Sequence, residues 1–123
     1  FRSRDLDALN LDKIPYCIIA GGSMLMHGLR NTTADIDIKI RPDYFEELKE
    51  RFNFAKSPKY SYLWEISDDI EVAVLEYDQK DVVIVDGYPV ESLESFLAWM
   101  LENNRPKDKE KIAAIRNYLA RRA

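Results

Sequence analysis

Residues 16–40 read YCIIAGGSMLMHGLRNTTADIDIKI, and this stretch carries most of the information about the fold. The compact apolar run at 16–20 is followed by two glycines, which predicts a buried strand that ends in a tight turn. The segment 23–29 lacks strict alternation and is predicted to be a helix. Residues 33–40 alternate as a half-buried strand does. The isoleucines occupy one side of that strand, and the other side carries Asp35, Asp37 and Lys39.

The rest of the chain supplies further helices and strands. Helices are predicted at 3–12, after Pro42, after Ser92 and after Pro106, and strands at 60–66, 70–75 and 82–85. Asp86-Gly87 supplies a turn, and Asn103-Asn104 ends a helix. The order predicts an α/β (α+β) fold in a single domain over residues 1–123. In it, helices pack on a mixed sheet of about four to six strands, and a helical pair forms the C-terminal end.

The composition limits the classes of protein to which the chain can belong. Its 123 residues are 46% hydrophobic and 33% charged, which fits one globular domain with a real core. The single cysteine, Cys17, excludes a disulfide framework, and the single histidine, His27, leaves little for a multi-histidine zinc site. No apolar run approaches the ~18 residues that indicate a membrane span. We therefore expect a reduced, cytoplasmic protein without a membrane partner.

The charge is unevenly distributed along the chain. Lysine and arginine total 18 against 22 aspartate and glutamate, a net charge of −4. From Arg105 onward, seven basic and two acidic residues give +5, so the preceding residues carry −9. The acidic body argues against wrapping nucleic acid by bulk electrostatics. The basic tail is either a solvated helix face or the place of one local phosphate contact.

The glycine pair and the two aspartates together suggest a nucleotide site. The glycines allow close backbone approach, and a helix that begins at Ser23 would present its N–H groups to an anion. Asp35 and Asp37 lie two apart on the next strand, so they project from one face and can share divalent metal ions, with Mg²⁺ favoured by hard oxygen ligands. Either feature alone is common for structural reasons. In combination they are typical of two-metal nucleotidyl transfer.

The segment 18–40 resembles the core motif of the nucleotidyltransferase superfamily, the polymerase-β-like fold. That motif is a Gly-Gly or Gly-Ser turn, a short spacer and an acid–apolar–acid triplet on the next strand. Residues 87–115, GYPVESLESFLAWMLENNRPKDKEKIAAI, are similar to the helical end of small bacterial and phage nucleotidyltransferase-like proteins, including the abortive-infection toxin type. The resemblance covers nearly the whole chain and implies a minimal nucleotidyltransferase fold.

The resemblance also implies site residues. The implied phosphate-binding residues are Gly21, Gly22, Ser23, Arg30 and Lys107. Asp35 and Asp37 are the implied catalytic acids and the ligands of two Mg²⁺ ions. Many relatives add a third acid on a nearby strand, and Glu71 is the catalytic candidate for it. Arg30 and Lys107 can equally be ordinary surface residues.

Three positions depart from the pattern of these relatives. One alignment places Ala73 where the third acid belongs, and Glu71 lies one pleat earlier on the same strand face. Met100 stands where toxin-type relatives often carry a lysine, and Lys111 stands where they often carry a further acid. These departures raise the chance of a changed or lost activity.

Together these features predict a Mg²⁺-dependent nucleotidyltransferase that moves a nucleoside monophosphate from a nucleoside triphosphate to an acceptor hydroxyl. The acceptor stays open between a transfer RNA end, a protein side chain and a small molecule. The alternative is a catalytically degenerate domain that serves as a nucleotide-binding or protein-partner module. Its partner would be a toxin or antitoxin, or a second copy in a homodimer joined through an exposed sheet edge or the terminal helices.

Overall fold

The computed structural model describes residues 11, 14–30, 36–52, 55–56, 63–66 and 70–122. Most of the predicted helix at 3–12, the predicted site residue Asp35 and the start of the predicted strand at 60–66 fall outside these ranges. The strands are β1 (Tyr16–Ile19), β2 (Ile36–Ile40), β3 (Ala55–Lys56), β4 (Leu63–Glu65), β5 (Ile70–Val74), β6 (Val82–Val85) and β7 (Tyr88–Glu91). The helices are α2 (Ala20–Met26), α3 (Phe45–Arg51), α4 (Leu93–Asn103) and α5 (Lys109–Arg122), with 3₁₀ turns at Pro42–Tyr44, Gln79–Asp81 and Pro106–Asp108.

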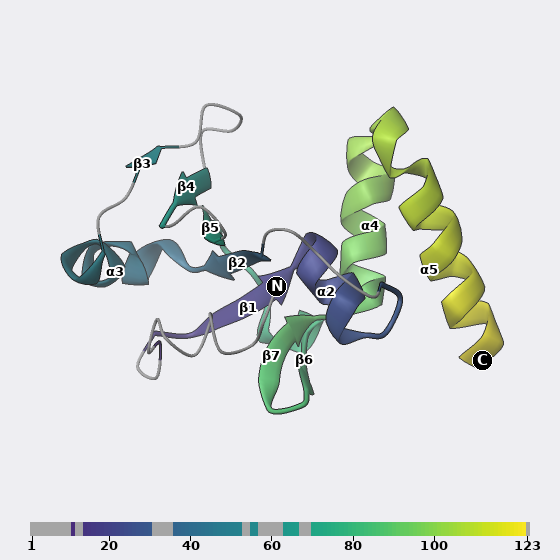
Figure 1. Ribbon diagram of the computed structural model, residues 1–123, viewed down its shortest axis with the longest axis horizontal. Helices are drawn as coiled ribbons and strands as arrows, with labels where there is room; N and C mark the ends of the chain where they lie inside the picture. The colour runs from purple at the N-terminus through teal and green to yellow at the C-terminus, as the bar shows by residue number, and fades with distance from the viewer. Residues whose placement is uncertain are drawn as a thin grey trace.

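Within the described ranges, the seven strands form one sheet in the order β3-β4-β5-β2-β1-β7-β6 (Figure 1). Strand β2 runs parallel to β5 and β1 runs parallel to β7, whereas the other neighbours are antiparallel. The predicted mixed sheet with helices packed on it is confirmed. It has more strands than expected because the short β3 and the second hairpin strand β7 add to the predicted segments. Figure 1 shows α3 at one end of the sheet and the pair α4 and α5 at the other.

The isoleucine side of β2 is the centre of the main core. Ile36, Ile38 and Ile40 are buried, as the alternation predicts, and they pack with Ile18 of β1 and Leu48 of α3. Burying such side chains contributes about 1.5–3 kcal/mol each relative to leaving them in water. The polar side of β2 therefore must face the other way, toward the C-terminal helices.

A second core cluster joins α2 to the C-terminal helical pair. Its buried members are Met24, Leu93, Phe96, Met100 and Ile115. Met100 is fully buried there, so the position at which toxin-type relatives often carry a lysine is a packing position in this chain. The cluster holds α4 and α5 in a defined place beside the sheet.

Helix α2 begins earlier than the sequence predicts. It starts at Ala20 rather than Ser23, so both glycines lie inside the helix, and the left-handed backbone falls on Ala20 with a φ of 55°. Gly22 is required for packing instead, because a Cβ there would lie 2.7 Å from Cγ2 of Ile18 and 3.3 Å from Cγ1 of Ile36. The prediction of a glycine turn before a helix at Ser23 is therefore wrong. Gly22 lets α2 approach the sheet closely.

The predicted turn at Asp86-Gly87, the Ser92 cap and the helix end at Asn103-Asn104 are confirmed. Ser92 caps α4, since its Oγ accepts a hydrogen bond of 3.1 Å from the backbone N–H of Ser95, and Asn104 ends α4 in the left-handed conformation. Asp86 and Gly87 have φ values of 51° and 85° and form the turn between β6 and β7. None of the helices in the described part of the chain is long and apolar enough to cross a membrane.

Candidate active site

The polar side of β2 places two predicted site residues next to each other. In the parallel register of β2 and β5, Asp37 lies directly opposite Glu71, and Lys39 lies opposite Ala73. Neighbouring strands in a sheet are ~4.7–4.9 Å apart. Asp37 and Glu71 are both half-buried and project on the side away from the isoleucine core. Ala73, where one alignment places the third acid, lies beside Lys39. Glu71, two residues earlier on the same side of β5, lies beside Asp37 instead.

A cleft of about 130 Å³ opens between this side of the sheet and the C-terminal helices. The charged residues that line it are Asp37, Lys39, Glu91, Arg105 and Lys111. Aromatic side chains from α4, Phe96 and Trp99, supply part of the apolar wall, and Ala73 lies in the floor. The cleft thus joins an acidic strand position to basic residues brought by the start of α5.

The basic wall is held in place by a buried acid. Asp108 is fully buried and accepts hydrogen bonds from Arg105 Nε at 2.7 Å and Arg105 Nη2 at 3.1 Å. Lys111 Nζ lies 3.8 Å from the same carboxylate. The Arg105 guanidinium also stacks over the Trp99 ring, 4.6 Å from its centroid. These contacts fix the direction of Arg105 and Lys111, which presents two cations at one wall of the cleft.

Glu91 is a buried acid on the opposite wall. Its side chain is held by Ser95, whose Oγ donates to Oε2 at 3.0 Å. Burial raises the pKa of Glu91 above its ordinary value, and the charge of Lys39 acts in the other direction. Lys39 is half-buried and forms no ion pair with the residues that the structure describes. Lys39 and Glu91 therefore face the same cleft, where the Lys39 ammonium partly offsets the effect of burial on the Glu91 carboxyl.

The backbone carbonyl of Glu91 ties α2 to β7. It accepts a hydrogen bond of 2.8 Å from Ser23 Oγ and lies 3.1 Å from His27 Nε2. Ser23 is fully buried, so its hydroxyl serves this internal contact and does not reach the cleft. His27 is the C-cap residue of α2. Ser23 thus holds two elements together.

The remaining predicted phosphate-binding residues lie away from the lining of the cleft. Gly21 and Gly22 are inside α2, and Arg30 is exposed in the segment that follows it. Lys107 is exposed in the 3₁₀ turn before α5, whereas its neighbours Arg105 and Lys111 point to the cleft. The prediction of a phosphate contact from this basic segment therefore stays open, with two other residues better placed to make it.

Sequence reasoning missed Lys39 and Glu91 as site residues. The signal for Lys39 was present, because the alternation of residues 33–40 puts it on the same side as Asp37. Glu91 stands between an apolar strand and a helix cap, where an acid looks like an ordinary solvent-facing residue. Only the pairing of β7 with β1 brings it into the cleft.

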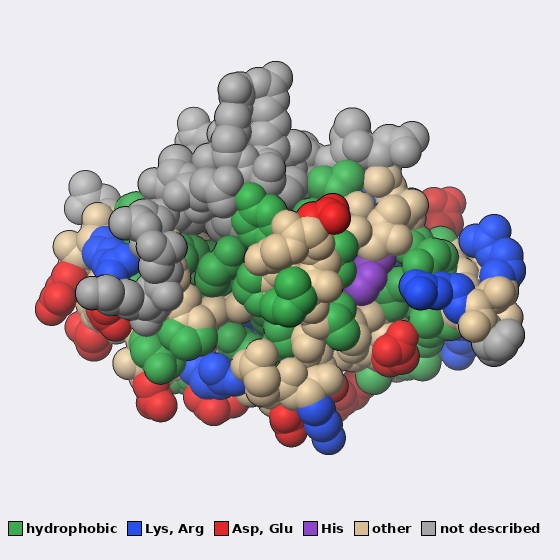
Figure 2. Space-filling model, turned by 90° about the horizontal axis from the view of Figure 1, so that it is seen from below, with side chains coloured by type: hydrophobic (Ala, Val, Ile, Leu, Met, Phe, Trp, Pro, Cys, Tyr) green, Lys and Arg blue, Asp and Glu red, His purple; other side chains and the backbone are tan. Residues whose placement is uncertain are grey.

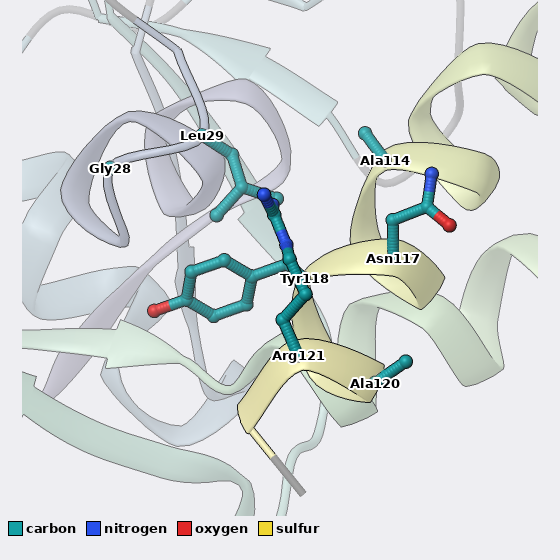
Figure 3. A pocket seen from close by; sticks show the side chains of 7 residues that line it. All are labelled: Gly28, Leu29, Ala114, Asn117, Tyr118, Ala120 and Arg121. Atoms are coloured by element: carbon teal, nitrogen blue, oxygen red, sulfur yellow. The ribbon is translucent and has the colours of Figure 1, made fainter.

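A larger, open hollow of about 650 Å³ lies between the turn after α2 and helix α5. Figure 3 shows Leu29, Tyr118 and Arg121 gathered there, while Asn117 points away along α5. It shares no lining residue with the cleft at Asp37. Its described lining residues include the polar Asn117, Tyr118 and Arg121 but no carboxylate that could hold a metal ion.

The fold of the chain is that of nucleotidyltransferases. A proposed nucleotidyltransferase from Thermotoga maritima, TM1012, superposes with a TM-score of 0.66 at 22% identity, over 97% of this chain and 92% of that one. ANT(2″)-Ia in complex with adenylyl-2″-tobramycin superposes with a TM-score of 0.56 at 17% identity, over 93% of this chain and 84% of that one. No protein-family model matches the sequence, and no curated protein matches it either. At these identities the likeness establishes the architecture.

The donor set at the sheet fits a hard divalent cation. Asp37 and Glu71 supply carboxylate oxygens, which Mg²⁺ prefers. Among the residues that the structure describes, no three His, Cys, Asp or Glu side chains gather closely enough to hold a metal alone. Asp35, the third predicted ligand, falls outside those residues. The site as described supplies two of the three carboxylates that the sequence predicts.

Proposed function

We propose that the chain transfers a nucleoside monophosphate from a nucleoside triphosphate to an acceptor hydroxyl. One observation carries the proposal: Asp37 and Glu71 are paired across parallel strands on the side of the sheet that faces a cleft with a basic opposite wall. Paired acids suit a metal-bound triphosphate, and the cations suit its negative charge. The fold shared with TM1012 and ANT(2″)-Ia supports this reaction class.

Each residue has a defined part in this proposal. Asp35, Asp37 and Glu71 would hold Mg²⁺, which would neutralise charge on the reacting phosphate and lower the pKa of the attacking hydroxyl. Arg105 and Lys111 would bind the phosphates that leave as pyrophosphate, since Asp108 holds both directed at the cleft. A planar guanidinium already fixed by Trp99 and Asp108 loses little freedom when it binds an anion.

Lys39 and Glu91 would set the charge of the cleft before the ligand arrives. The Lys39 ammonium lines the cleft two residues after Asp37 on the same side of β2. It adds positive charge beside the metal carboxylates, and it would favour the ionised form of Glu91 against the effect of burial. A triphosphate that enters the cleft would therefore meet three cations, with Lys39 on the strand wall and Arg105 and Lys111 on the helix wall.

The acceptor is proposed to be a small molecule with hydroxyl groups, ahead of an RNA end or a protein side chain. The ANT(2″)-Ia structure contains adenylyl-2″-tobramycin, and this chain spans most of the length of ANT(2″)-Ia. The net charge of −4 also disfavours a polyanionic acceptor. Transfer RNA and protein acceptors remain in the test as competing outcomes.

The second candidate is a module of the same fold that binds a nucleotide without transferring it. Ala73 in the floor of the cleft favours it, because the resemblance places an acid near this position. The two candidates differ in product. The module would bind a Mg²⁺–triphosphate and release it unchanged.

A labelled-nucleotide assay separates these candidates. The purified chain is incubated with each of the four α-³²P triphosphates and Mg²⁺, with tobramycin, total tRNA or bacterial lysate protein as acceptor. The proposal predicts Mg²⁺-dependent label on an acceptor and release of pyrophosphate, both lost in Glu71→Gln. The matched control is Glu76→Gln, an exposed acid beyond the end of β5. Triphosphate binding without label on any acceptor would favour the module.

A further inference from the structure

Strand β6 forms one edge of the sheet and carries exposed apolar side chains. In the described part of the chain the sheet ends at β6, and Ile84 is 70% exposed and Val83 38% exposed. Figure 2, seen from the side on which β6 and β7 project in Figure 1, shows hydrophobic side chains gathered at the middle of this surface. An edge strand of this composition is a template for pairing with another strand.

The hairpin geometry fixes which backbone groups of β6 point outward. Asp86 and Gly87 form a two-residue turn, so the closing pair Val85 and Tyr88 exchanges hydrogen bonds. Hydrogen-bonded and non-bonded pairs alternate along an antiparallel ladder. Val83 therefore also bonds inward to β7. The N–H and C=O of Ile84 and the C=O of Val82 point to the free edge, whereas the N–H of Val82 donates to the carbonyl of Gln79 in the 3₁₀ turn. Pro89 agrees with this phase, because it lies opposite Ile84 and has no N–H to give.

A second copy of the same strand is complementary to this edge. Two antiparallel β6 strands can bond only if the outward residues of one face the outward residues of the other. The register centred on Val83 places Val82 opposite Ile84 of the second copy and Val83 opposite itself, so three residues of each strand overlap. It forms two backbone hydrogen bonds, each from the Ile84 N–H of one copy to the Val82 C=O of the other, and it sets Ile84, the most exposed apolar side chain of the edge, within the paired strands. Registers shifted by one residue set outward groups against inward ones and are excluded.

Charge supports the same register. Lys80 precedes β6 and Asp86 follows it, and both are exposed. In the register centred on Val83, position 80 of each copy lies opposite position 86 of the other, so Lys80 of one copy is near Asp86 of the other. The register centred on Ile84 instead sets Asp86 against Val82 and leaves Lys80 beyond the paired strand. Opposite charges across strands stabilise a pair, whereas like charges oppose it.

We propose that β6 pairs antiparallel with β6 of a second copy of this chain, with Val83 of both copies on the two-fold axis. The contact is isologous, so it closes as a dimer and joins the two sheets into one. The opposite edge is β3, two exposed residues that include a lysine, and it offers no comparable apolar strand. A contact of three strand residues from each copy implies a weak dimer that depends on chain concentration. This inference does not depend on the proposed reaction.

Cross-linking with single cysteines tests the register. Non-bonded pairs on an antiparallel ladder lie close enough for a disulfide, so Val83→Cys should give a disulfide-linked dimer under mild oxidation. The matched control is Ile84→Cys, which is more exposed but faces Val82 of the second copy. The native Cys17 is buried, and burial raises its pKa to about 12, so it should not compete. Faster cross-linking by Ile84→Cys would overturn the proposal.

Sedimentation at increasing chain concentration tests the dimer itself. The wild-type chain should pass from monomer to dimer, and Ile84→Lys should stay monomeric because it sets a charge in the apolar contact. Leu101→Lys, which changes another exposed apolar residue on α4, should dimerise as the wild type does. A wild-type chain that remains monomeric at millimolar concentration would overturn the proposal, as would an Ile84→Lys dimer of unchanged strength.

Discussion

Asp37 and Glu71 lie directly opposite each other in the parallel register of β2 and β5. They belong to segments separated by α3 and two further strands, so the sheet brings them together from distant parts of the chain. Both project away from the isoleucine core and toward the side where Arg105 and Lys111 line a cleft. Glu71, whose role the sequence leaves open, is therefore the direct neighbour of Asp37, the acid that the motif predicts.

Removing the charge of Asp108 should weaken both the fold and ligand binding. Asp108→Asn should lower the free energy of unfolding by about 1.5–3 kcal/mol, because hydrogen bonds to a charged group are lost at a buried position. Arg105 would lose its direction, so affinity for triphosphate should fall as well. Urea unfolding and calorimetry measure the two effects. Glu110→Gln, which changes an exposed acid in the first turn of α5, should change the free energy of unfolding by less than about 0.5 kcal/mol.

Replacing Glu91 by glutamine should alter how stability depends on pH. Burial raises the pKa of Glu91 in the folded chain, so its ionisation opposes folding as pH rises above the ordinary value of 4.5. Glu91→Gln removes that ionisation. The free energy of unfolding of the variant minus that of the wild type should therefore grow as pH rises through the raised pKa, and then level off.

Denaturant unfolding from about pH 4 to pH 8 measures this difference. Glu94→Gln on the exposed side of α4 provides the control, and its difference from the wild type should show no comparable rise. A difference that shrinks with rising pH for Glu91→Gln would mean that Lys39 stabilises the ionised carboxylate more strongly than burial disfavours it.

Alanine at position 22 should destabilise the chain even though it favours a helix. Helix propensity alone predicts a gain of about 0.8–1.0 kcal/mol for Gly22→Ala. The new Cβ would lie 2.7 Å from Cγ2 of Ile18, and overpacking of this kind costs about 1–3 kcal/mol. Thermal or urea unfolding should therefore show a net loss. A net gain would indicate that α2 can move away from the sheet.

Much of the fold follows from local patterns that the sequence makes visible. The isoleucine alternation of β2, the Asp86-Gly87 turn and the Ser92 cap are short-range features, and each appears in the structure where it was predicted. The start of α2 was not predictable, because the reason for Gly22 is its approach to Ile18 and Ile36 across the sheet. Local rules favour a turn at a glycine pair, whereas the packing of α2 against the sheet places both glycines inside the helix.

The site was predicted less completely than the fold. The motif spacing predicts Asp37 and strand phase suggests Glu71, and the structure sets the two acids opposite each other on one side of the sheet. Which basic residues face the cleft depends on how Asp108 orders the start of α5, a contact that no spacing rule supplies. Glu91 reaches the cleft only because β7 pairs with β1. Residues gathered by topology rather than by motif were therefore the ones missed.

The most direct measurement of the central claim is the thermal stabilisation given by Mg²⁺ and triphosphate together. A ligand at about 100 times its dissociation constant adds about 2.7 kcal/mol, which raises Tm by about 10 °C in a domain of this size. We predict such a rise for the wild type and for Asp43→Asn, an exposed acid before α3, but none for Asp37→Asn. Equal rises for wild type and Asp37→Asn would contradict the account, and so would a wild-type Tm that Mg²⁺ and triphosphate leave unchanged.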